Sequence, residues 1–168
     1  AAARRVGLPL QVETHRGTAT ETPEKFFAIA EGYRRATGEL LPVTWDHSHF
    51  AVTKHMRAEH FSERLLTTPD LVRHSRLFHC RPFNGHHCMI PITDGKGNFS
   101  PEYEACRPFI RQALKHWLAG PRPNNELWVV PEQGTTIGYN LSCFPNIWQD
   151  TVVLGNDIKK IWNELLAE

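Results

Sequence analysis

Short hydrophobic runs alternate along the chain with longer segments in which hydrophobic residues recur at helical spacing. The short runs cover residues 8–13, 40–45, 76–80 and 126–130, and each is typical of a buried β-strand. Helical segments separate them, so the predicted order is β-α-β-α-β-α-β-α. This order implies an α/β fold with one parallel sheet and right-handed crossovers. A barrel and a doubly wound sheet both satisfy it.

Residues typical of helix ends support this order. Thr22 and Pro23 favour a helix start and Gly38 favours a helix end, so we predict the first long helix between them. Residues 52–66 are expected to contain helix, and Pro69 opens a short helical turn. The chain is therefore expected to reach its third strand through short helices.

Two further long helices are predicted in the second half of the chain. Ser100 and Pro101 begin the first of them, and Pro108 is expected to kink or restart it. Asn156 is expected to cap the last helix, which covers residues 157–166.

The composition indicates one globular domain that covers residues 1–168. Lysine and arginine number 19 against 18 aspartate and glutamate, and this net charge of +1 disfavours a nucleic-acid partner. No stretch approaches the roughly 18 consecutive apolar residues of a membrane helix. The four cysteines show no CxxC spacing and fit a reducing compartment. The sequence therefore predicts a cytoplasmic protein.

A carboxylate or a histidine stands at the end of each predicted strand. These residues are Glu13, Asp46, His79 and Glu132. Because the carboxyl ends of parallel strands meet at one edge of a sheet, we expect these side chains to converge. Three carboxylates in one cleft repel one another, and a divalent cation keeps all of them ionised. The donor set suits Mn²⁺, Mg²⁺, Co²⁺ or Zn²⁺.

A second segment offers an alternative metal site. Cys80, His86, His87 and Cys88 have the side chains that zinc prefers, but their spacing matches no standard finger or ribbon. We therefore expect His86 and His87 to lie on an active-site loop or to face solvent.

The strand-end motifs resemble those of a known family. Val12-Glu13-Thr14-His15-Arg16-Gly17, Asp46 with His49, Phe78-His79-Cys80-Arg81 and Val130-Pro131-Glu132 are similar to the last four strands of the xylose-isomerase-like sugar-phosphate isomerase/epimerase barrels. The resemblance implies a TIM barrel, of which this chain is the four-unit C-terminal half barrel. It also implies one divalent metal ion on Glu13, Asp46, His79 and Glu132, with the two glutamates as catalytic acid and base.

The implied function is divalent-metal-dependent isomerisation or epimerisation of a sugar or sugar phosphate in carbohydrate metabolism. The reaction proceeds by proton abstraction next to a carbonyl. The candidate substrate-binding residues are His15, Arg16, His49, Arg81 and His86. The family usually has a further polar residue after its histidine, and this chain has Gly85 there. The loop over residues 134–138 is a candidate phosphate-binding segment.

Two other functions fit this resemblance. One is phosphodiester hydrolysis of the abasic-site endonuclease type, which needs more metal ions and a basic groove. The other is a non-catalytic relative that binds a metal or a sugar.

The resemblance covers nearly the whole chain but only half of a barrel, which needs about 250 residues. We therefore expect the chain to pair with an N-terminal half-barrel fragment or with a second copy. The isolated chain need not be active.

Overall fold

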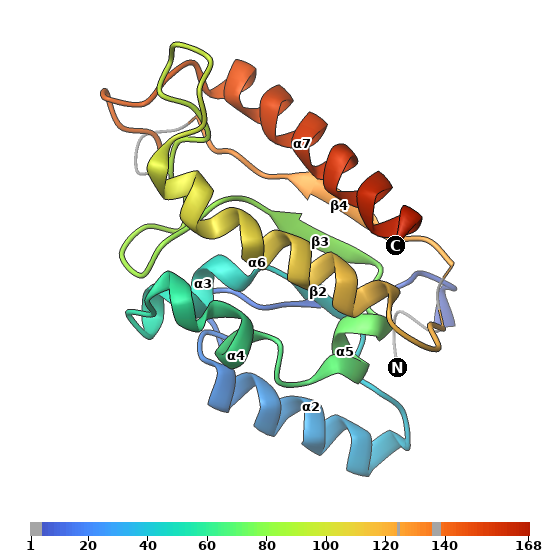
Figure 1. The fold of residues 1–168 in the computed structure, drawn as a ribbon. Coiled ribbons are helices and arrows are strands. Elements are labelled where there is room, and N and C mark those ends of the chain that lie inside the picture. Colours follow the sequence, from blue (N-terminus) through green and yellow to red (C-terminus); the bar gives the residue numbers. More distant parts are fainter. Residues whose placement is uncertain (1–4, 124, 136–138) are drawn as a thin grey trace.

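The structure is a computed structural model that describes residues 5–123, 125–135 and 139–168. Four parallel strands form one sheet: β1 (Val12–Glu13), β2 (Val43–Trp45), β3 (Leu77–Cys80) and β4 (Trp128–Pro131). Their order in the sheet follows their order in the sequence (Figure 1). The prediction of an α/β fold with a parallel sheet is confirmed.

Six α-helices and one 3₁₀ helix are described. They are α2 (Pro23–Thr37), α3 (His47–Thr53), η1 (Ala58–His60), α4 (Phe61–Leu65), α5 (Pro69–His74), α6 (Pro101–Leu118) and α7 (Ile147–Ala167). Helix α2 has its predicted ends, because the Thr22 side chain accepts a hydrogen bond from the Lys25 amide and Gly38 adopts φ 75°. The predicted start of α6 is also confirmed, with Ser100 accepting from the Tyr103 amide at 3.0 Å.

The first strand is shorter than predicted. A strand was expected over residues 8–13, but only Val12 and Glu13 form it, and Leu8 and Leu10 are each 66% exposed. Strand β1 lies at the end of the described sheet, where only β2 offers hydrogen-bond partners. The beginning of this strand is therefore decided by pairing and not by hydrophobicity.

Three helix predictions need correction. Asn146 caps α7 by accepting from the Trp148 and Gln149 amides, so the predicted start at Asn156 is wrong. Pro108 does not restart α6, because it lies on the exposed side of one continuous helix, where water solvates the carbonyl that lacks a partner. The helical region predicted within residues 52–66 begins earlier than expected, because Asp46 caps α3.

Helices α2, α6 and α7 cover one face of the sheet (Figure 1). Phe26 of α2 lies against Trp45 of β2, with ring centroids 5.2 Å apart. Residues of α6 line a small cavity with Phe78 of β3, and residues of α7 line a groove with Val129 and Pro131 of β4. Strand residues at the alternating positions face away from these three helices.

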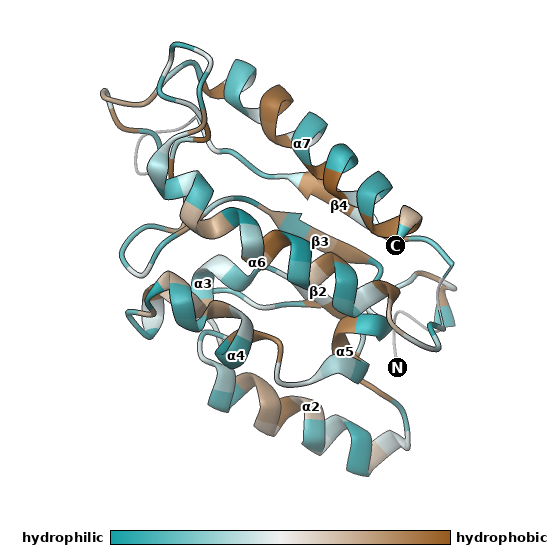
Figure 2. Ribbon diagram, in the orientation of Figure 1, coloured by the Kyte–Doolittle hydropathy of each residue, from teal (hydrophilic) through white to brown (hydrophobic). Residues whose placement is uncertain are grey.

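The long helices are amphipathic. Figure 2 shows hydrophobic and hydrophilic bands along α7, and the buried side of α6 includes Phe109, Ala113 and Trp117. No described helix is long and apolar enough to cross a membrane.

An ionic contact joins α6 to α7. Asp157 accepts hydrogen bonds from the Tyr103 hydroxyl at 2.6 Å and from Arg107 Nε and Nη2 at 2.7 and 2.9 Å. Burial raises the pKa of Asp157, but the hydrogen bonds from Arg107 and Tyr103 outweigh it and lower the pKa below its ordinary value. Asp157 is therefore an anion that holds the two helices together.

We predict that Asp157→Asn lowers the free energy of unfolding at pH 7 by about 2 kcal/mol, because the charge-assisted hydrogen bonds are lost. The folded-state pKa lies below the unfolded one, so this stabilisation exists above about pH 4 and is lost as the pH falls through the folded pKa. Urea unfolding at pH 7 and pH 3 should show a smaller difference between variant and parent at pH 3. The exposed Glu104→Gln is the control, and equal stabilities at pH 7 would contradict the prediction.

Candidate functional site

The four residues predicted at the strand ends lie along one edge of the sheet. Residues that pair across neighbouring strands point to the same face, so Glu13, Thr44 and Leu77 share a face. Asp46 and His79 lie two residues beyond Thr44 and Leu77, and they extend this face towards the carboxyl ends. Glu132 follows β4, and its amide donates to the Cys80 carbonyl at 3.3 Å. This face points away from α2, α6 and α7.

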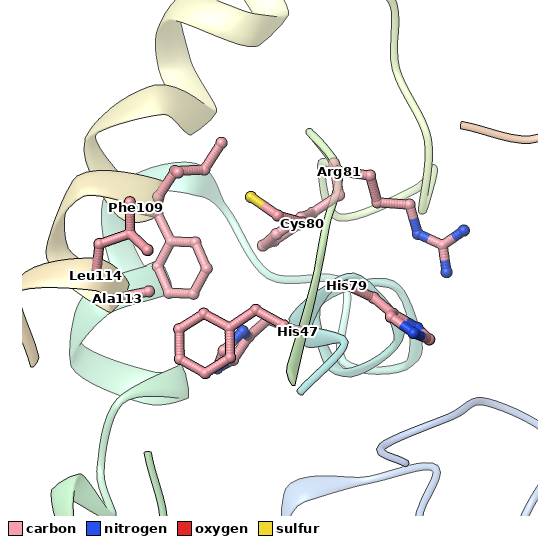
Figure 3. A pocket seen from close by; sticks show the side chains of 10 residues that line it. His47, His79, Cys80, Arg81, Phe109, Ala113 and Leu114 are labelled. Atoms are coloured by element: carbon pink, nitrogen blue, oxygen red, sulfur yellow. The ribbon is translucent and has the colours of Figure 1, made fainter. Parts of the chain in front are cut away.

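Strand β3 separates the site from the core. Figure 3 shows His79 and Arg81 on one side of the strand, and Cys80 on the other side with Phe109 of α6. Cys80 also lines the small cavity between β3 and α6, and burial raises the pKa of its thiol. The alternative zinc site, which needs Cys80 beside His86 and His87, is therefore not formed.

His47 lies on the core side as well. Its ring stacks on Trp45, with centroids 4.9 Å apart and planes 3° apart, and meets the edge of Phe109. Burial lowers the pKa of His47 to about 4, although the Asp46 charge acts in the opposite direction. His47 is therefore a neutral core residue near pH 7.

His79 lies between the two glutamates. Its Nδ1 atom is 3.0 Å from Glu13 Oε1 and 3.5 Å from Glu132 Oε2. The Glu13 and Glu132 side chains are 38% and 39% exposed, so a ligand can reach both carboxylates. The sheet thus presents two accessible carboxylates on either side of one imidazole.

Asp46 is completely buried, and several neighbours fix its position. Thr14 Oγ1 donates to the Asp46 carbonyl and accepts from the Asp46 amide, each at 2.9 Å. The carboxylate accepts from the Ser48 amide at 3.0 Å and from the Ser48 hydroxyl, and His49 Nε2 lies 3.2 Å from Oδ2. Burial raises the pKa of Asp46, but the hydrogen bond from His49 and the charge of Arg81 outweigh it and lower the pKa to about 2.

Arg81 is the main counter-charge of this cluster. Its buried guanidinium forms an ion pair with Asp46 and lies 3.3 Å from Glu132 Oε2. It also donates from Nε to the Ser48 hydroxyl at 3.2 Å. Burial lowers the pKa of Arg81, but the charges of Asp46 and Glu132 outweigh it and raise the pKa above its usual value. Arg81, expected on the substrate, therefore holds two carboxylates in this structure.

The two other candidate histidines lie beside Asp46. His49 is fully buried, and its ring centroid is 4.0 Å from that of His15. His49 Nε2 is also 3.0 Å from Arg81 Nη2. His15 is half-buried, and its Nδ1 is 2.6 Å from the Arg16 carbonyl oxygen. His49 Nε2 donates to Asp46 in the tautomer that carries its proton there, and it accepts from Arg81 in the other tautomer. The half-buried His15 ring packs against the His49 ring.

A pocket of about 160 Å³ lies next to this cluster. Its lining includes the predicted residues Arg16 and His86, together with His87 and Tyr139. The Tyr139 ring bridges the pocket and the cluster, because the guanidinium carbons of Arg16 and Arg81 lie 5.9 and 5.8 Å from its centroid.

The donor atoms of three predicted metal ligands are close together. Glu13, Asp46 and His79 each offer one ligand atom, and these atoms lie within 4.8 Å of one another. Two carboxylate oxygens and one imidazole nitrogen fit a hard or borderline divalent ion. Glu132, the fourth predicted ligand, lies outside this group of three. It contacts His79, a member of the group, and Arg81, which forms an ion pair with Asp46.

Two site residues were missed by the sequence analysis. Ser48 could have been found, because a serine two residues after an aspartate N-cap is well placed to bond that carboxylate. Tyr139 has no local signal, since it reaches the site only through the path of the chain after β4. In the candidate phosphate-binding loop, residues 136–138 lie outside the described residues.

We predict that Arg81→Met lowers the free energy of unfolding by about 3–5 kcal/mol, because Asp46 is left as a buried, uncompensated charge. The double variant Asp46→Asn, Arg81→Met should recover part of this loss, since it leaves neither charge buried. Urea unfolding of the parent, both single variants and the double variant gives the coupling energy. Arg73→Met, which removes a partly exposed ion pair with Asp70, is the control and should cost less than about 1 kcal/mol. Additive losses would contradict the prediction.

No family model matches the chain, and neither a curated protein nor a solved structure matches it. The chemistry of this sheet edge therefore rests on its own residues and their geometry.

Proposed function

We propose that the chain carries the site of a divalent-metal-dependent isomerase or epimerase that acts on a sugar or sugar phosphate. The observation that supports this function best is the pair of accessible glutamates, Glu13 and Glu132, on either side of His79 and next to a buried aspartate. Exchange of a proton on carbon needs a base and an acid that reach the substrate from different directions. Two carboxylates on separate strands meet this need.

The donor set is suited to one divalent ion. Glu13, Asp46 and His79 would hold it, with Glu132 as the fourth ligand. The bound ion would stabilise the negative charge that develops on the oxygens next to the carbon that loses its proton. A phosphodiesterase of the endonuclease type would need further metal ligands, and the described residues form one such cluster.

The proton transfers are assigned to this chain's own carboxylates. One of Glu13 and Glu132 removes a proton next to the carbonyl, and the other returns a proton to the neighbouring carbon or to the opposite face of the same carbon. Arg81 Nη2 lies 3.3 Å from Glu132 Oε2, and this contact orients the Glu132 carboxylate. His79 contacts both carboxylates and keeps their positions relative to each other.

We also propose that the sheet is four consecutive units of a (β/α)₈ barrel of the xylose-isomerase-like type. Sequential strand order with helices on one face is what such units require. Trp128 is 64% exposed and belongs to the face that points away from the helices. Exposed apolar surface of this kind is typically covered in a complete protein. Four further βα units, from an N-terminal half-barrel fragment or a second copy, would cover it.

We predict that the chain binds Mn²⁺ and that Glu13→Gln and Asp46→Asn each weaken binding by at least about tenfold, because each removes an anionic ligand. Isothermal titration with Mn²⁺ measures the affinity. Glu24→Gln, a change of an exposed glutamate on α2, is the control and should bind as the parent does. No Mn²⁺ binding to the parent, or equal binding by the Glu13 and Asp46 variants, would contradict the metal site.

Glu132→Gln separates an isomerase from a metal-binding relative. If Glu132 moves a proton, the variant loses proton exchange between substrate carbon and solvent even when it is saturated with Mn²⁺, as measured by deuterium incorporation from D₂O into a panel of aldoses and their phosphates. Equal rates of proton exchange in parent and variant would overturn the catalytic proposal. So would the absence of proton exchange by the parent when four further βα units complete the barrel.

We predict that the isolated chain self-associates or binds a hydrophobic dye, because the open face of the sheet exposes Trp128. Trp128→Lys should reduce both effects, as measured by sedimentation velocity and dye fluorescence. The control is Trp148→Lys on α7, which changes a tryptophan that is 74% exposed on another element and should leave both effects unchanged. A compact monomer that binds no dye would contradict the half-barrel proposal.

A further inference from the structure

The pocket beside the carboxylate cluster has a basic lining. Three of its lining residues carry or can take up a positive charge, namely Arg16, His86 and His87, and no acidic residue lines it in the described part of the chain. The remaining lining is aromatic, aliphatic or sulfur-containing: Cys88, Met89, Tyr139, Leu141 and Phe144. A pocket of about 160 Å³ has room for several water molecules, and therefore for a small charged group.

Arg16 has no carboxylate partner within the described part of the chain. Its guanidinium lies 5.9 Å from the centroid of the Tyr139 ring, and none of the ion pairs between described residues involves it. Arg81 differs, since Asp46 and Glu132 already occupy its guanidinium. Arg16 is thus the arginine at this edge whose charge is available to a ligand.

The loop that presents the two histidines is rigidly built. The Asn84 side chain accepts hydrogen bonds from the His86 and His87 amides, each at 2.8 Å, and the Asn84 amide donates to the His87 carbonyl at 3.0 Å. A Cβ atom on Gly85 would lie 2.4 Å from the Met56 carbonyl oxygen, so the turn can approach the segment after α3 this closely only with glycine. His86 and His87 are therefore held at the pocket by packing and by hydrogen bonds.

We infer that this pocket binds a terminal anionic group of the substrate, a phosphate or a carboxylate, through Arg16, His86 and His87. The Tyr139 ring lies near both Arg16 in the pocket and Arg81, which contacts Glu132, so the pocket adjoins the carboxylate cluster. The inference of a sugar rests on the proposed function, whereas the inference of an anion does not. An arginine fork matches the oxygens of phosphate and carboxylate groups equally.

Titration of the full chain with inorganic phosphate tests the anion site without any need for turnover. We expect saturable binding that weakens by roughly tenfold to a hundredfold in Arg16→Gln, and that also weakens in the double variant His86→Gln, His87→Gln. Arg64→Gln, which changes an exposed arginine on α4 that does not line this pocket, should bind as the parent does. Circular dichroism of each variant confirms that the fold is retained.

A second arm compares glucose 6-phosphate, glucuronate and glucose as probes. Tighter binding of the phosphate ester or of the uronate identifies the source of the anion, and either result must be sensitive to Arg16→Gln. Absence of phosphate binding, equal binding by parent and Arg16→Gln, or equal affinity for all three sugars would overturn the inference. Mn²⁺ affinity should be the same in Arg16→Gln as in the parent, so failure of this site is distinguishable from failure of the metal site.

Discussion

A buried carboxylate at the carboxyl edge of the sheet, and the arginine that neutralises it, organise the rest of the site. Asp46 has no exposed surface, so its ionised form requires a nearby positive charge and several hydrogen-bond donors. Arg81 supplies the charge from the end of the next strand, and Ser48 and His49 supply donors from the helix that Asp46 itself caps. The same carboxylate thus caps α3 and, through its ion pair with Arg81, links the ends of β2 and β3.

Arg81 has a second consequence for the chemistry of this edge. Its guanidinium already pairs with the Asp46 carboxylate, so a divalent ion at the proposed metal site would compete with it for the lone pairs of that carboxylate. A stronger Arg81 contact would therefore weaken the binding of an ion there. Glu13 lies outside this competition, since its closest described partner is His79 at 3.0 Å. The two glutamates thus have different charged neighbours, which suits the separate acid and base roles that we propose for them.

The alternation of side chains along the strands keeps chemistry and packing apart. Phe78 and Cys80 of β3 line the cavity next to α6, while His79 and Arg81, the residue that follows the strand, lie on the other side of the strand (Figure 3). The core beneath the helices can therefore be dry and aromatic without affecting the polar residues at the adjacent positions. His47 shows the same separation within α3, because it stacks on Trp45 whereas its neighbours Asp46 and Ser48 face the site.

By itself, the sequence determined the features that depend on residues close together in the chain. The caps of α2 and α6, the alternation of four strands with helices, and the polar residue after each strand are local patterns, and the structure has them. The start of α7 was predicted wrongly because Asn146, and not Asn156, is its N-cap. The extent of β1 was predicted wrongly because only Val12 and Glu13 pair with β2. Only the tertiary structure decided the contact of Arg81 with Asp46, 35 residues away, and of His79 with Glu13, 66 residues away. Such pairs form when the folded strands come into register. No pattern within one segment specifies which distant charged residue its side chains will contact. The position of Tyr139 between Arg16 and Arg81 depends in the same way on the three-dimensional path of the chain after β4.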